Sequence, residues 1–479
     1  MIFEELLKSC AANNINVCSD SRKVEKGDIF VAISGTNEDG AKYIPKALEL
    51  GASYIVCSEK VAIDIDCDSS KIVIYNESRE ALWKLAQARF HTSDLPIKII
   101  GVTGTNGKTT CSYLLEKLYQ ENGYKVGVIG TVSYRWPGYS EPAALTTPDS
   151  LQIHSMLSQM YKAGVNAVIM EVSSHSLAQK RVDGISFNSV GFTNLTQDHL
   201  DFHKDMNDYF KIKARLFNEL AKNSFKVINV DDKWGQKLFE MNPDAFTYGL
   251  NTNLSSKKSL KSKVISSGTQ GSSLEMTFNG NTWNIDTPLV GEFNVYNLLC
   301  AQALALASGM SEKELMPLAK FSGVPGRLEK IVNKDNLNVF VDYAHTPDAL
   351  INVLNALRGV GFEKIVTVFG CGGNRDKTKR PLMGQAVAEL SDIAVLTSDN
   401  PRFEDPEAII NDVLPGLSNA KKVIVEKDRR LATEKALSLI SKNDALLIAG
   451  KGHEDYQIIN GVKHHYSDQE VVRELLQCI

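Results

Sequence analysis

The sequence predicts an α/β fold of three domains, and three observations support this prediction. Apolar segments of strand length alternate with stretches of helical spacing along the chain. At 479 residues, the chain is long enough for about three domains. Its composition, 43% hydrophobic and 23% charged, is ordinary for a globular protein. We expect a smaller α/β domain at 1–96, a central domain with a parallel sheet at 97–325 and a Rossmann-like domain at 326–479.

Charge and cysteine content narrow the class of protein. A net charge of −4 argues against a broad nucleic-acid-binding surface. The eight cysteines are scattered and form no C-x-x-C pair, which is typical of a reduced cytoplasmic protein. The N-terminal residues are acidic where a signal peptide would be basic, and no apolar run reaches membrane-spanning length. We therefore expect a cytoplasmic protein with no membrane insertion and no nucleic-acid partner.

The first 96 residues alternate short strands with helical stretches. The expected strands are 28–33, 54–57 and 71–75. Pro96 then precedes a new apolar strand, which favours a domain boundary at this point.

Residues 98–110 read as a buried strand that runs into a glycine-rich loop and then a helix. Gly104 and Gly107 let the backbone approach an anion, and Lys108 and Thr109 stand where the helix begins. Backbone N–H groups and a lysine bind phosphate, while a hydroxyl can hold Mg²⁺. The strict P-loop spacing would put a glycine at Val102, one residue after the glycine that is present. We predict a P-loop ATPase domain that uses ATP with Mg²⁺.

Two further strands of the central region also end in polar residues. Glu171 ends one strand in the same expected sheet as Thr109 and suits a Mg²⁺ ligand. Another strand leads into His199 and His203, which together with Asp198 and Asp201 could be read as a transition-metal site. Because no zinc-like spacing is present, hydrogen-bonded structural histidines or a hard-cation site are favoured. Residues 251–273 are polar and read as a loop or an irregular hairpin.

The last region repeats one pattern four times, because a strand is followed at once by polar residues. In a parallel sheet these four strand ends lie along one edge, where open α/β folds bind ligands. Arg375 and Arg402 make a carboxylate or phosphate the expected ligand. The four polar segments are 342–348, 370–376, 398–402 and 449–455.

A series of motifs in one order resembles the Mur ligases of peptidoglycan synthesis, and in particular the members that add the third peptide residue. The resemblance covers essentially the whole chain. The motifs are Asp20–Arg22, Gly104–Thr109, Glu171–His175, Asn194–Asp201, Gly326–Arg327, Asp342–Pro347, Asp399–Arg402 and Gly450–Glu454.

The resemblance implies a UDP-binding N-terminal domain, a central ATPase and a C-terminal domain for the incoming amino acid. It also implies that ATP phosphorylates the D-glutamate side-chain carboxylate of UDP-N-acetylmuramoyl-L-Ala-D-Glu. The amino group of meso-2,6-diaminopimelate then attacks the acyl phosphate, and a tetrahedral intermediate collapses to amide and phosphate. Elementary chemistry agrees, because a carboxylate resists an amine until phosphate becomes its leaving group. The expected partners are small molecules, and the expected state is a monomer.

The resemblance also assigns roles to individual residues. The catalytic residues are Lys108, Glu171, Lys213 and His345. The nucleotide-binding residues are Gly104, Thr105, Asn106, Gly107, Lys108, Thr109, Thr110, Asn294, Asn297, Arg327 and Asp342. The UDP-sugar dipeptide residues are Ser19, Ser21, Thr36, Asn37, Glu38, Thr146, Thr147, Ser173, Gln179 and Arg181. The diaminopimelate residues are Arg375, Asp399, Asn400, Pro401, Arg402, Gly450 and Glu454. The Mg²⁺ ligands are Thr109, Glu171 and carbamylated Lys213.

On composition alone, Lys213 would be a solvated helix lysine. The resemblance changes this interpretation, because the family carries a carbamylated lysine that Tyr209, Leu216 and Phe217 align with Lys213. A carbamate is anionic and can ligate Mg²⁺, which an ammonium would repel. Family members commonly have a small residue where this chain has Ile212.

Arg402 is expected to decide which amino acid is added. Diaminopimelate carries a distal carboxylate that a guanidinium can bind with two hydrogen bonds, whereas lysine would leave the arginine unpaired. Glu454 suits an ammonium group of the same ligand. L-Lysine addition remains open, as do a folylpolyglutamate-synthetase-like ligase, a P-loop kinase or transport ATPase and a non-catalytic ATP-binding partner.

Overall fold

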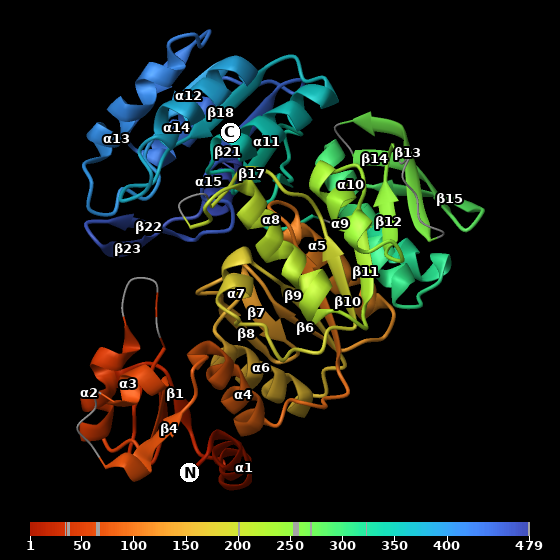
Figure 1. Cartoon of the computed structure of the whole chain (residues 1–479). Coiled ribbons are helices and arrows are strands. Elements are labelled where there is room, and N and C mark those ends of the chain that lie inside the picture. The colour runs from red at the N-terminus through yellow and green to blue at the C-terminus, as the bar shows by residue number, and fades with distance from the viewer. Residues whose placement is uncertain are drawn as a thin grey trace. The chain divides into compact units, whose positions relative to one another are not determined.

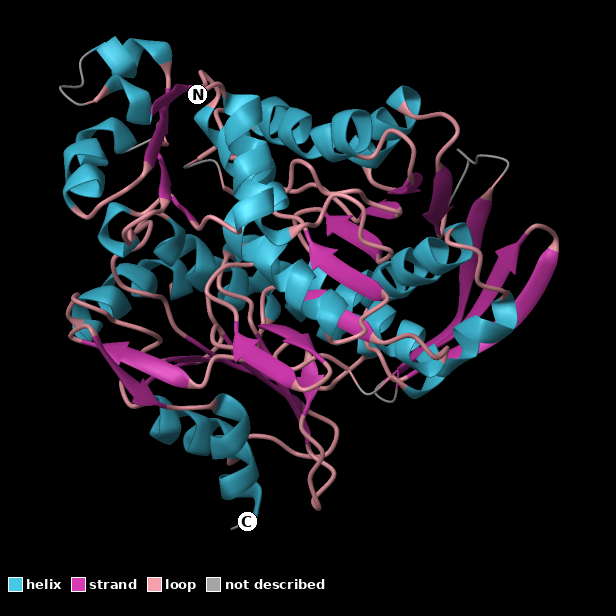
Figure 2. Cartoon of the chain, turned by 90° about the horizontal axis from the view of Figure 1, so that it is seen from below, coloured by secondary structure: helices cyan, strands magenta, loops and turns pink. Residues whose placement is uncertain are grey.

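The computed structural model describes residues 1–33, 35, 39–63, 68–199, 202–251, 258–268, 271–321 and 323–477. It contains two compact units, one formed by 1–259 and 300–315 and the other by 260–299 and 316–479. Figure 1 labels their elements, and Figure 2 shows helices on both sides of the strands. The α/β class is confirmed, whereas the boundaries expected near residues 96 and 325 stay predictions.

The N-terminal part of the first unit is a parallel sheet in the order β1-β2-β3-β4. Apolar residues cover both of its faces and form two separate cores. Its strands are β1 (Val17–Cys18), β2 (Ile29–Val31), β3 (Tyr54–Cys57) and β4 (Ile72–Ile74). Its helices are α1 (Phe3–Asn13), η1 (Ser21–Lys23), η2 (Gly40–Tyr43), α2 (Ile44–Glu49), α3 (Glu59–Ile63), η3 (Ser69–Lys71) and α4 (Ser78–Phe90).

The central sheet of the first unit has the order β12-β11-β10-β5-β9-β6-β7-β8. Strand β5 pairs in parallel with both β9 and β10, so the loop after β5 emerges between two further strand ends. The strands are β5 (Lys98–Thr103), β6 (Val126–Ile129), β7 (Ser133–Trp136), β8 (Tyr139–Pro142), β9 (Ala167–Glu171), β10 (Ser189–Phe192), β11 (Phe225–Asn229) and β12 (Phe246–Gly249).

Helices cover this sheet and supply much of its core. Apolar side chains of α6, α8 and α9 pack against the inner residues of β9, β10 and β11 in one large cluster. The helices are α5 (Lys108–Glu121), α6 (Ser150–Lys162), α7 (Ser174–Ala178), α8 (Met206–Arg215), the π-helical turn η4 (Leu216–Leu220) and α9 (Lys233–Met241).

The second unit begins with an antiparallel meander in the order β13-β14-β15. Its strands are β13 (Ser259–Gly268), β14 (Gly271–Phe278) and β15 (Asn281–Thr287). The pairing of β13 with β14 shifts register between Val264 and Ser266, so the irregular hairpin expected near 251–273 is confirmed for its described part. Helix α10 (Glu292–Ala307) and turn η5 (Glu312–Lys320) follow in the chain, and residues 300–315 of this stretch belong to the first unit.

The remainder of the second unit is built on a sheet in the order β16-β17-β21-β18-β19-β20. Strands β17 to β20 and β21 run parallel, so their carboxyl ends share one edge, as the sequence predicts. The strands are β16 (Glu329–Lys330), β17 (Asn338–Asp342), β18 (Ile365–Phe369), β19 (Ile393–Leu396), β20 (Val423–Val425), β21 (Ala445–Ala449), β22 (Tyr456–Ile459) and β23 (Val462–His465).

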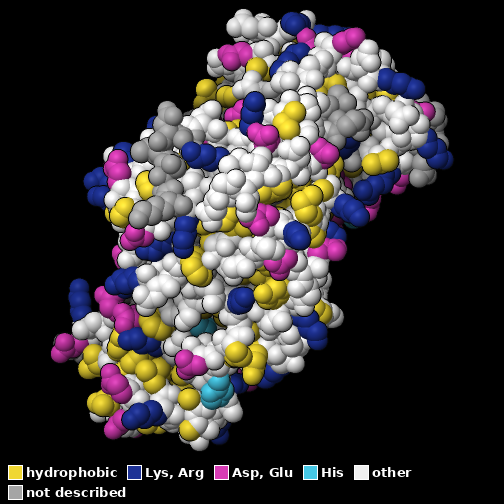
Figure 3. Space-filling view, turned by 90° about the vertical axis from the view of Figure 1, so that its right-hand side faces the viewer, with side chains coloured by type: hydrophobic (Ala, Val, Ile, Leu, Met, Phe, Trp, Pro, Cys, Tyr) yellow, Lys and Arg dark blue, Asp and Glu magenta, His cyan; other side chains and the backbone are white. Residues whose placement is uncertain are grey.

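Helices flank both faces of this sheet, and each face has its own apolar core. The helices are α11 (Pro347–Val360), α12 (Lys379–Leu390), α13 (Pro406–Val413), η6 (Leu414–Leu417), α14 (Arg429–Leu437) and α15 (Asp468–Gln477). Side chains of both charge signs are interspersed over the face drawn in Figure 3. Among the described residues, no helix is long and apolar enough to cross a membrane.

Candidate active site

The loop between β5 and α5 has a backbone that only glycine allows at two positions. Gly104 has a φ of +149° and Gly107 a φ of +86°. A Cβ on Gly104 would lie 1.9 Å from Oγ1 of Thr193 and 3.0 Å from the carbonyl oxygen of Asn194. In the described structure no side chain caps the N-terminus of α5, and the first turn of a helix is the place where backbone N–H groups bind an anion.

The rest of this loop is tied to the residues after β10. The backbone N–H of Thr105 donates to the carbonyl of Asn194 at 2.9 Å, and that of Asn106 donates to the Asn194 side-chain oxygen at 3.0 Å. Thr110 is buried in the first turn of α5. These contacts fix the backbone of the loop against the segment that follows β10.

Two lysines from different helices converge on one carbonyl of the loop. Nζ of Lys108 donates to the carbonyl oxygens of Gly104 at 2.9 Å and Thr105 at 2.8 Å. Nζ of Lys213, which is 1% exposed, donates to the same Gly104 oxygen at 2.8 Å. Burial, with the nearby charge of Lys108, holds the pKa of Lys213 well below its usual range. The interpretation from composition alone, a solvated helix lysine, is therefore wrong, because α8 packs this side chain into the core.

Glu171 accepts hydrogen bonds on both carboxylate oxygens at the end of β9. Oγ1 of Thr109 donates to one oxygen at 3.0 Å, and Oγ1 of Thr131 donates to the same oxygen at 2.8 Å. The backbone N–H of Thr131 donates to the other at 3.0 Å. The predicted pairing of Thr109 with Glu171 is present, while Thr131 was missed by the sequence analysis although it closely follows β6.

These oxygens are chemically suited to Mg²⁺, which prefers carboxylate and hydroxyl ligands. No group of three or more His, Cys, Asp or Glu side chains that could hold a metal ion occurs among the described residues. The interpretation of 198–203 as a transition-metal site therefore gains no support, and Asp201 lies outside the described residues.

The two histidines after β10 differ in their surroundings. His203 is buried, and its Nε2 lies 2.9 Å from Oγ of Ser174, as expected for a hydrogen-bonded structural histidine. His199 has a φ of +54° and packs edge-on against His175. Burial lowers the pKa of His199 to about 4, although Asp198 opposes this shift. The imidazole of His199 is therefore neutral near pH 7.

Five residues predicted to contact the sugar dipeptide form one network beside Glu171. Oγ1 of Thr147 donates to the Glu171 carbonyl at 2.6 Å and accepts from the Ser173 N–H at 3.0 Å. The Arg181 guanidinium donates to the Thr147 carbonyl at 2.8 Å and to the side-chain oxygen of Gln179 at 2.7 and 3.0 Å. Hydroxyls of Thr146 and Thr131 lie 3.1 Å apart.

The structure describes only two of the residues predicted to bind the uridine end of the UDP-sugar dipeptide. Ser19 is half-buried after β1, and Ser21 is buried in η1, where the Asp20 carboxylate accepts from the N–H of Arg22. Thr36, Asn37 and Glu38 lie outside the described residues.

In the second unit, two predicted asparagines share one turn of α10. Both are buried, and Nδ2 of Asn297 donates to Oδ1 of Asn294 at 3.1 Å. Nδ2 of Asn294 in turn donates to the Val290 carbonyl at 2.9 Å.

Arg327, Asp342 and His345 gather around Tyr343 in the second unit. The Arg327 guanidinium lies 4.7 Å from the Tyr343 ring centroid, and its buried Nε has no hydrogen-bond partner among the described residues. The Asp342 carboxylate accepts from the N–H of Ala344 at 2.7 Å, and burial raises its pKa despite nearby Arg327. Nδ1 of His345 lies 2.8 Å from the Tyr343 carbonyl oxygen.

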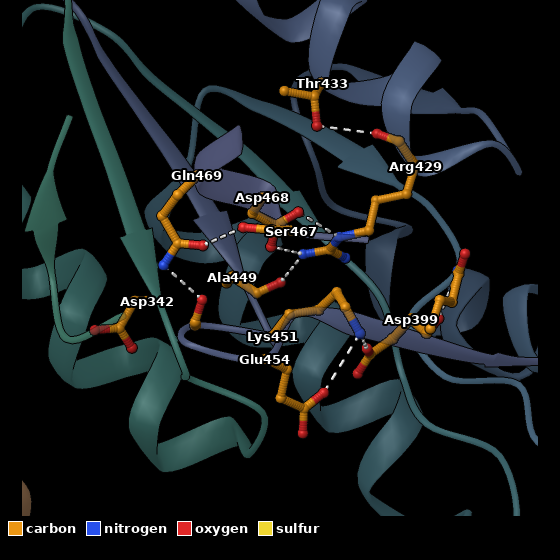
Figure 4. Close-up of polar contacts among 12 residues, drawn as sticks. Asp342, Asp399, Arg429, Thr433, Ala449, Lys451, Glu454, Ser467, Asp468 and Gln469 are labelled. Carbon is orange, nitrogen blue, oxygen red and sulfur yellow. Dashed lines mark hydrogen bonds and ion pairs between the residues drawn. The ribbon is translucent and has the colours of Figure 1, made fainter. Parts of the chain in front are cut away.

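Residues predicted to bind the amino acid follow β19 and β21, and Figure 4 shows two of them, Asp399 and Glu454, on either side of Lys451. Nδ2 of Asn400 donates to the Glu454 carboxylate at 2.9 Å, although 54 residues separate them in sequence. A Cβ on Gly450, whose φ is +117°, would lie 3.6 Å from the Asp399 carboxylate. These groups therefore form one polar cluster, as the parallel edge predicts.

Arg402 has a left-handed backbone with a φ of +56°, and its Nη1 donates to the Gly373 carbonyl at 2.7 Å. A Cβ on Gly372 would lie 2.9 Å from that nitrogen and 3.8 Å from Cγ of Arg375, so the two arginines flank this glycine. Gly373 also packs on the Pro401 carbonyl. Glycines after β18 thus make room for the predicted guanidinium groups.

Sequence reasoning missed two groups in this region. Lys451 is fully buried between the predicted Asp399, Asn400 and Glu454. The second group is the β22–β23 hairpin, which holds residues 400–402. The N–H of Ile458 donates to the side-chain oxygen of Asn400, and the Ile458 carbonyl accepts from the N–H of Arg402. The Gly-Lys-Gly pattern was a signal for the lysine, but nothing in the sequence reveals its partners.

A P-loop and a polar sheet edge in one chain are the features expected of an ATP-dependent ligase. The chain belongs to the Mur ligase family. The family's catalytic domain matches residues 15–90, its middle domain 102–305 and its glutamate ligase domain 326–452.

Similar proteins point to one branch of this family. The UDP-N-acetylmuramoyl-L-alanyl-D-glutamate--2,6-diaminopimelate ligase of Lawsonia intracellularis is 54% identical over 96% of each chain. The ligase of that name from Aquifex aeolicus is 44% identical over 95% of this chain and 92% of its own. A solved structure with this ligase name has a TM-score of 0.70 at 33% identity, covering 97% and 94% of the two chains. A MurF ligase from Thermotoga maritima in complex with ADP shares the fold, with a TM-score of 0.62 at 19% identity over 97% of both chains.

Proposed function

We propose that this chain joins 2,6-diaminopimelate to the D-glutamate side-chain carboxylate of UDP-N-acetylmuramoyl-L-alanyl-D-glutamate, using ATP, in peptidoglycan precursor synthesis. Relatives of that name match nearly the whole chain at 54% and 44% identity. The observation that carries the proposal is the cluster of Asn400 and Glu454 beside Arg402, because it offers both an ammonium partner and a carboxylate partner.

The first unit carries the groups for the activation step. Lys108 and the first-turn N–H groups of α5 bind the phosphates of ATP, where negative charge gathers during transfer to the carboxylate. Bound Mg²⁺ would stabilise the same charge. Its ligands are Thr109 and Glu171, supported by their 3.0 Å contact, together with Lys213 once carbamylated. The neutral amine favoured by the lowered pKa of Lys213 is the form that reacts with CO₂.

The network beside Glu171 is proposed to hold the sugar dipeptide, so that the glutamate carboxylate lies near the transferred phosphate. The first-unit residues in this role are Ser19, Ser21, Thr146, Thr147, Ser173, Gln179 and Arg181. In the second unit, the family resemblance gives nucleotide contacts to Asn294, Asn297, Arg327 and Asp342, with His345 as a further catalytic residue. The unpartnered buried Nε of Arg327 is consistent with an anionic ligand.

Selection of the amino acid is assigned to the edge formed by β18, β19 and β21. Arg375 and Arg402 bind the distal carboxylate that lysine lacks, while Asp399 and Glu454 bind an ammonium. Asn400, Pro401 and Gly450 shape the pocket between them. We also propose that the enzyme is cytoplasmic and monomeric. Light scattering after gel filtration would check the oligomeric state.

Phosphate release tests this function. The reaction contains ATP, MgCl₂, the UDP-sugar dipeptide and either diaminopimelate or L-lysine, and each component is omitted in turn. Release should require all components and should be much faster with diaminopimelate. Faster release with lysine would support the lysine-adding ligase instead. Release with a folate and glutamate, but not with the UDP-sugar dipeptide, would support a folylpolyglutamate-synthetase-like enzyme.

A further inference from the structure

Lys451 is a fully buried lysine in the loop after β21, and its ammonium contacts three predicted ligand-binding residues. Nζ lies 3.5 Å from Oδ1 of Asp399, 3.2 Å from Oδ1 of Asn400 and 3.3 Å from Oε2 of Glu454. Figure 4 shows its side chain pointing between Asp399 and Glu454. The Lys451 side chain is 0% exposed, so its ammonium exchanges water for these three partners.

The backbone around Lys451 is held on both sides. Arg429 donates to the Ala449 carbonyl at 2.9 Å and forms two 2.8 Å contacts with Asp468, and both side chains of this ion pair are fully buried. After the lysine, Nε2 of Gln469 donates to the Gly452 carbonyl at 2.8 Å (Figure 4). The ammonium is therefore fixed by the fold, and its partners must adopt positions that match it.

The charges of this cluster explain what the lysine does. Asp399 and Glu454 have side chains only 9% and 17% exposed, so two negative charges in this environment repel each other strongly. One ammonium between them leaves a net charge of −1. A net charge of −1 is balanced by one ammonium group of the ligand. A net charge of −2 would instead favour a ligand with excess positive charge, such as lysine.

The lysine also fixes the orientation of Asn400. Oδ1 of Asn400 accepts from Lys451 at 3.2 Å and from the Ile458 N–H at 2.9 Å, so its Nδ2 must point at Glu454. Asn400 and Glu454 are thereby set relative to Arg402, whose backbone N–H donates to the Ile458 carbonyl at 2.9 Å. The Lys451 ammonium thus connects the carboxylates of the pocket, through Asn400 and Ile458, to Arg402.

We propose that Lys451 is a positioning residue that sets selectivity for diaminopimelate over lysine by holding Asp399, Asn400 and Glu454 in place. It acts through these residues rather than by touching the ligand. The inference rests on the proposed function, because it takes diaminopimelate as the ligand of this edge.

The test compares Lys451→Met, which keeps an unbranched side chain one atom shorter and removes the charge, with Lys451→Arg, which keeps the charge. Lys463→Met is the matched control, because Lys463 is exposed and its Nζ lies 4.2 Å from the ring of Tyr456, which Lys451 approaches at 5.6 Å. Phosphate release by the full-length enzyme gives kcat and KM for ATP, diaminopimelate and L-lysine.

Lys451→Met should raise KM for diaminopimelate about 30-fold and change KM for ATP less than about threefold. The reason is that the substitution displaces side chains in the proposed diaminopimelate site and leaves the ATP site intact. The ratio of kcat/KM for diaminopimelate to that for lysine should fall at least about tenfold, and Lys451→Arg should recover part of it. An unchanged ratio, or equal losses for ATP and diaminopimelate, would overturn the inference. A wild-type enzyme inactive with diaminopimelate would overturn the proposed function instead.

A charge-balance variant keeps the test decisive if Lys451→Met folds poorly. Asp399→Asn in the same chain restores the net charge of −1, so the double variant should unfold at a higher temperature than Lys451→Met alone. Lys451→Met should also raise the diaminopimelate KM by a smaller factor in the Asp399→Asn background than in wild type. Equal factors in both backgrounds would contradict a role exerted through Asp399.

Discussion

The phosphate loop and the amino-acid edge solve recognition in different ways. The loop is one short segment whose backbone N–H groups and glycines suit any phosphate, with Lys108 adding a charge. The edge is assembled from side chains of separate segments, such as Asn400 and Glu454, held together across 54 residues of sequence. Under the proposed function, the backbone of the loop supplies the common chemistry of activation, while a long-range network of side chains supplies the choice of substrate.

The largest effect is expected where the loop contributes charge. Lys108→Met should lower kcat for phosphate release by about 1000-fold, because a positive charge on the transferring phosphoryl group is lost. Binding of diaminopimelate, measured by calorimetry, should be nearly unchanged. The control is Lys117→Met on the same helix, because Lys117 forms an ion pair with exposed Glu121. Comparable losses in both variants would contradict the specific role of the loop.

Removing the Lys213 amine should have the next largest effect. Lys213→Met should lower kcat about 100-fold, because the carbamate proposed as a Mg²⁺ ligand can then no longer form. Wild-type activity should fall in CO₂-stripped buffer and return with bicarbonate, whereas the variant should not respond. Exposed Lys211 on the same helix supplies the control variant Lys211→Met. Full activity of Lys213→Met would contradict a catalytic role for a carbamate at this position.

A smaller and more selective effect is expected at the edge. Arg402→Lys should raise KM for diaminopimelate about 30-fold, because an ammonium cannot form both hydrogen bonds of the guanidinium to a carboxylate. KM for ATP should change little in steady-state assays. Arg430→Lys, at an exposed ion pair with Glu474, is the control. A uniform loss for both substrates would indicate misfolding rather than a lost contact.

The smallest effect is one of stability. Burial lowers the pKa of His154 to about 4, and the ring contacts the Thr92 hydroxyl at 2.6 Å. The unfolded chain, with a pKa near 6.5, binds this proton more tightly, so acid favours unfolding. Between pH 6.5 and 4, wild type should lose up to about 3 kcal/mol from this group.

Denaturant unfolding of His154→Gln at pH 7.5 and pH 5 checks this sign. The variant should lose less stability on acidification than wild type, while exposed His464→Gln should behave like wild type. Equal acid losses in His154→Gln and wild type would show that other groups carry the pH dependence.

The same contrast explains which features of the fold and the candidate site could be predicted from the sequence. The loop at 104–110 and the parallel edge were predictable because glycine spacing and strand-end polarity are local signals. Strand β1 was missed because two residues are too short to show a period. Thr131 and Lys451 were missed because their roles depend on partners brought together only by the sheets.

The sequence alone could not decide the environment of Lys213 either. Its helical position suits a solvated side chain, and only packing of α8 under the loop makes it 1% exposed. The family resemblance supplied what composition could not. Carbamylation of Lys213 stays a prediction, which the bicarbonate experiment tests.

A single competition reaction tests the central claim most directly. Equal concentrations of diaminopimelate and L-lysine are mixed with ATP, MgCl₂, the UDP-sugar dipeptide and the full-length enzyme, and products are identified by mass. If the edge around Arg402 selects the distal carboxylate, the diaminopimelate product should exceed the lysine product by at least about 100-fold. Equal amounts, or an excess of the lysine product, would contradict the account.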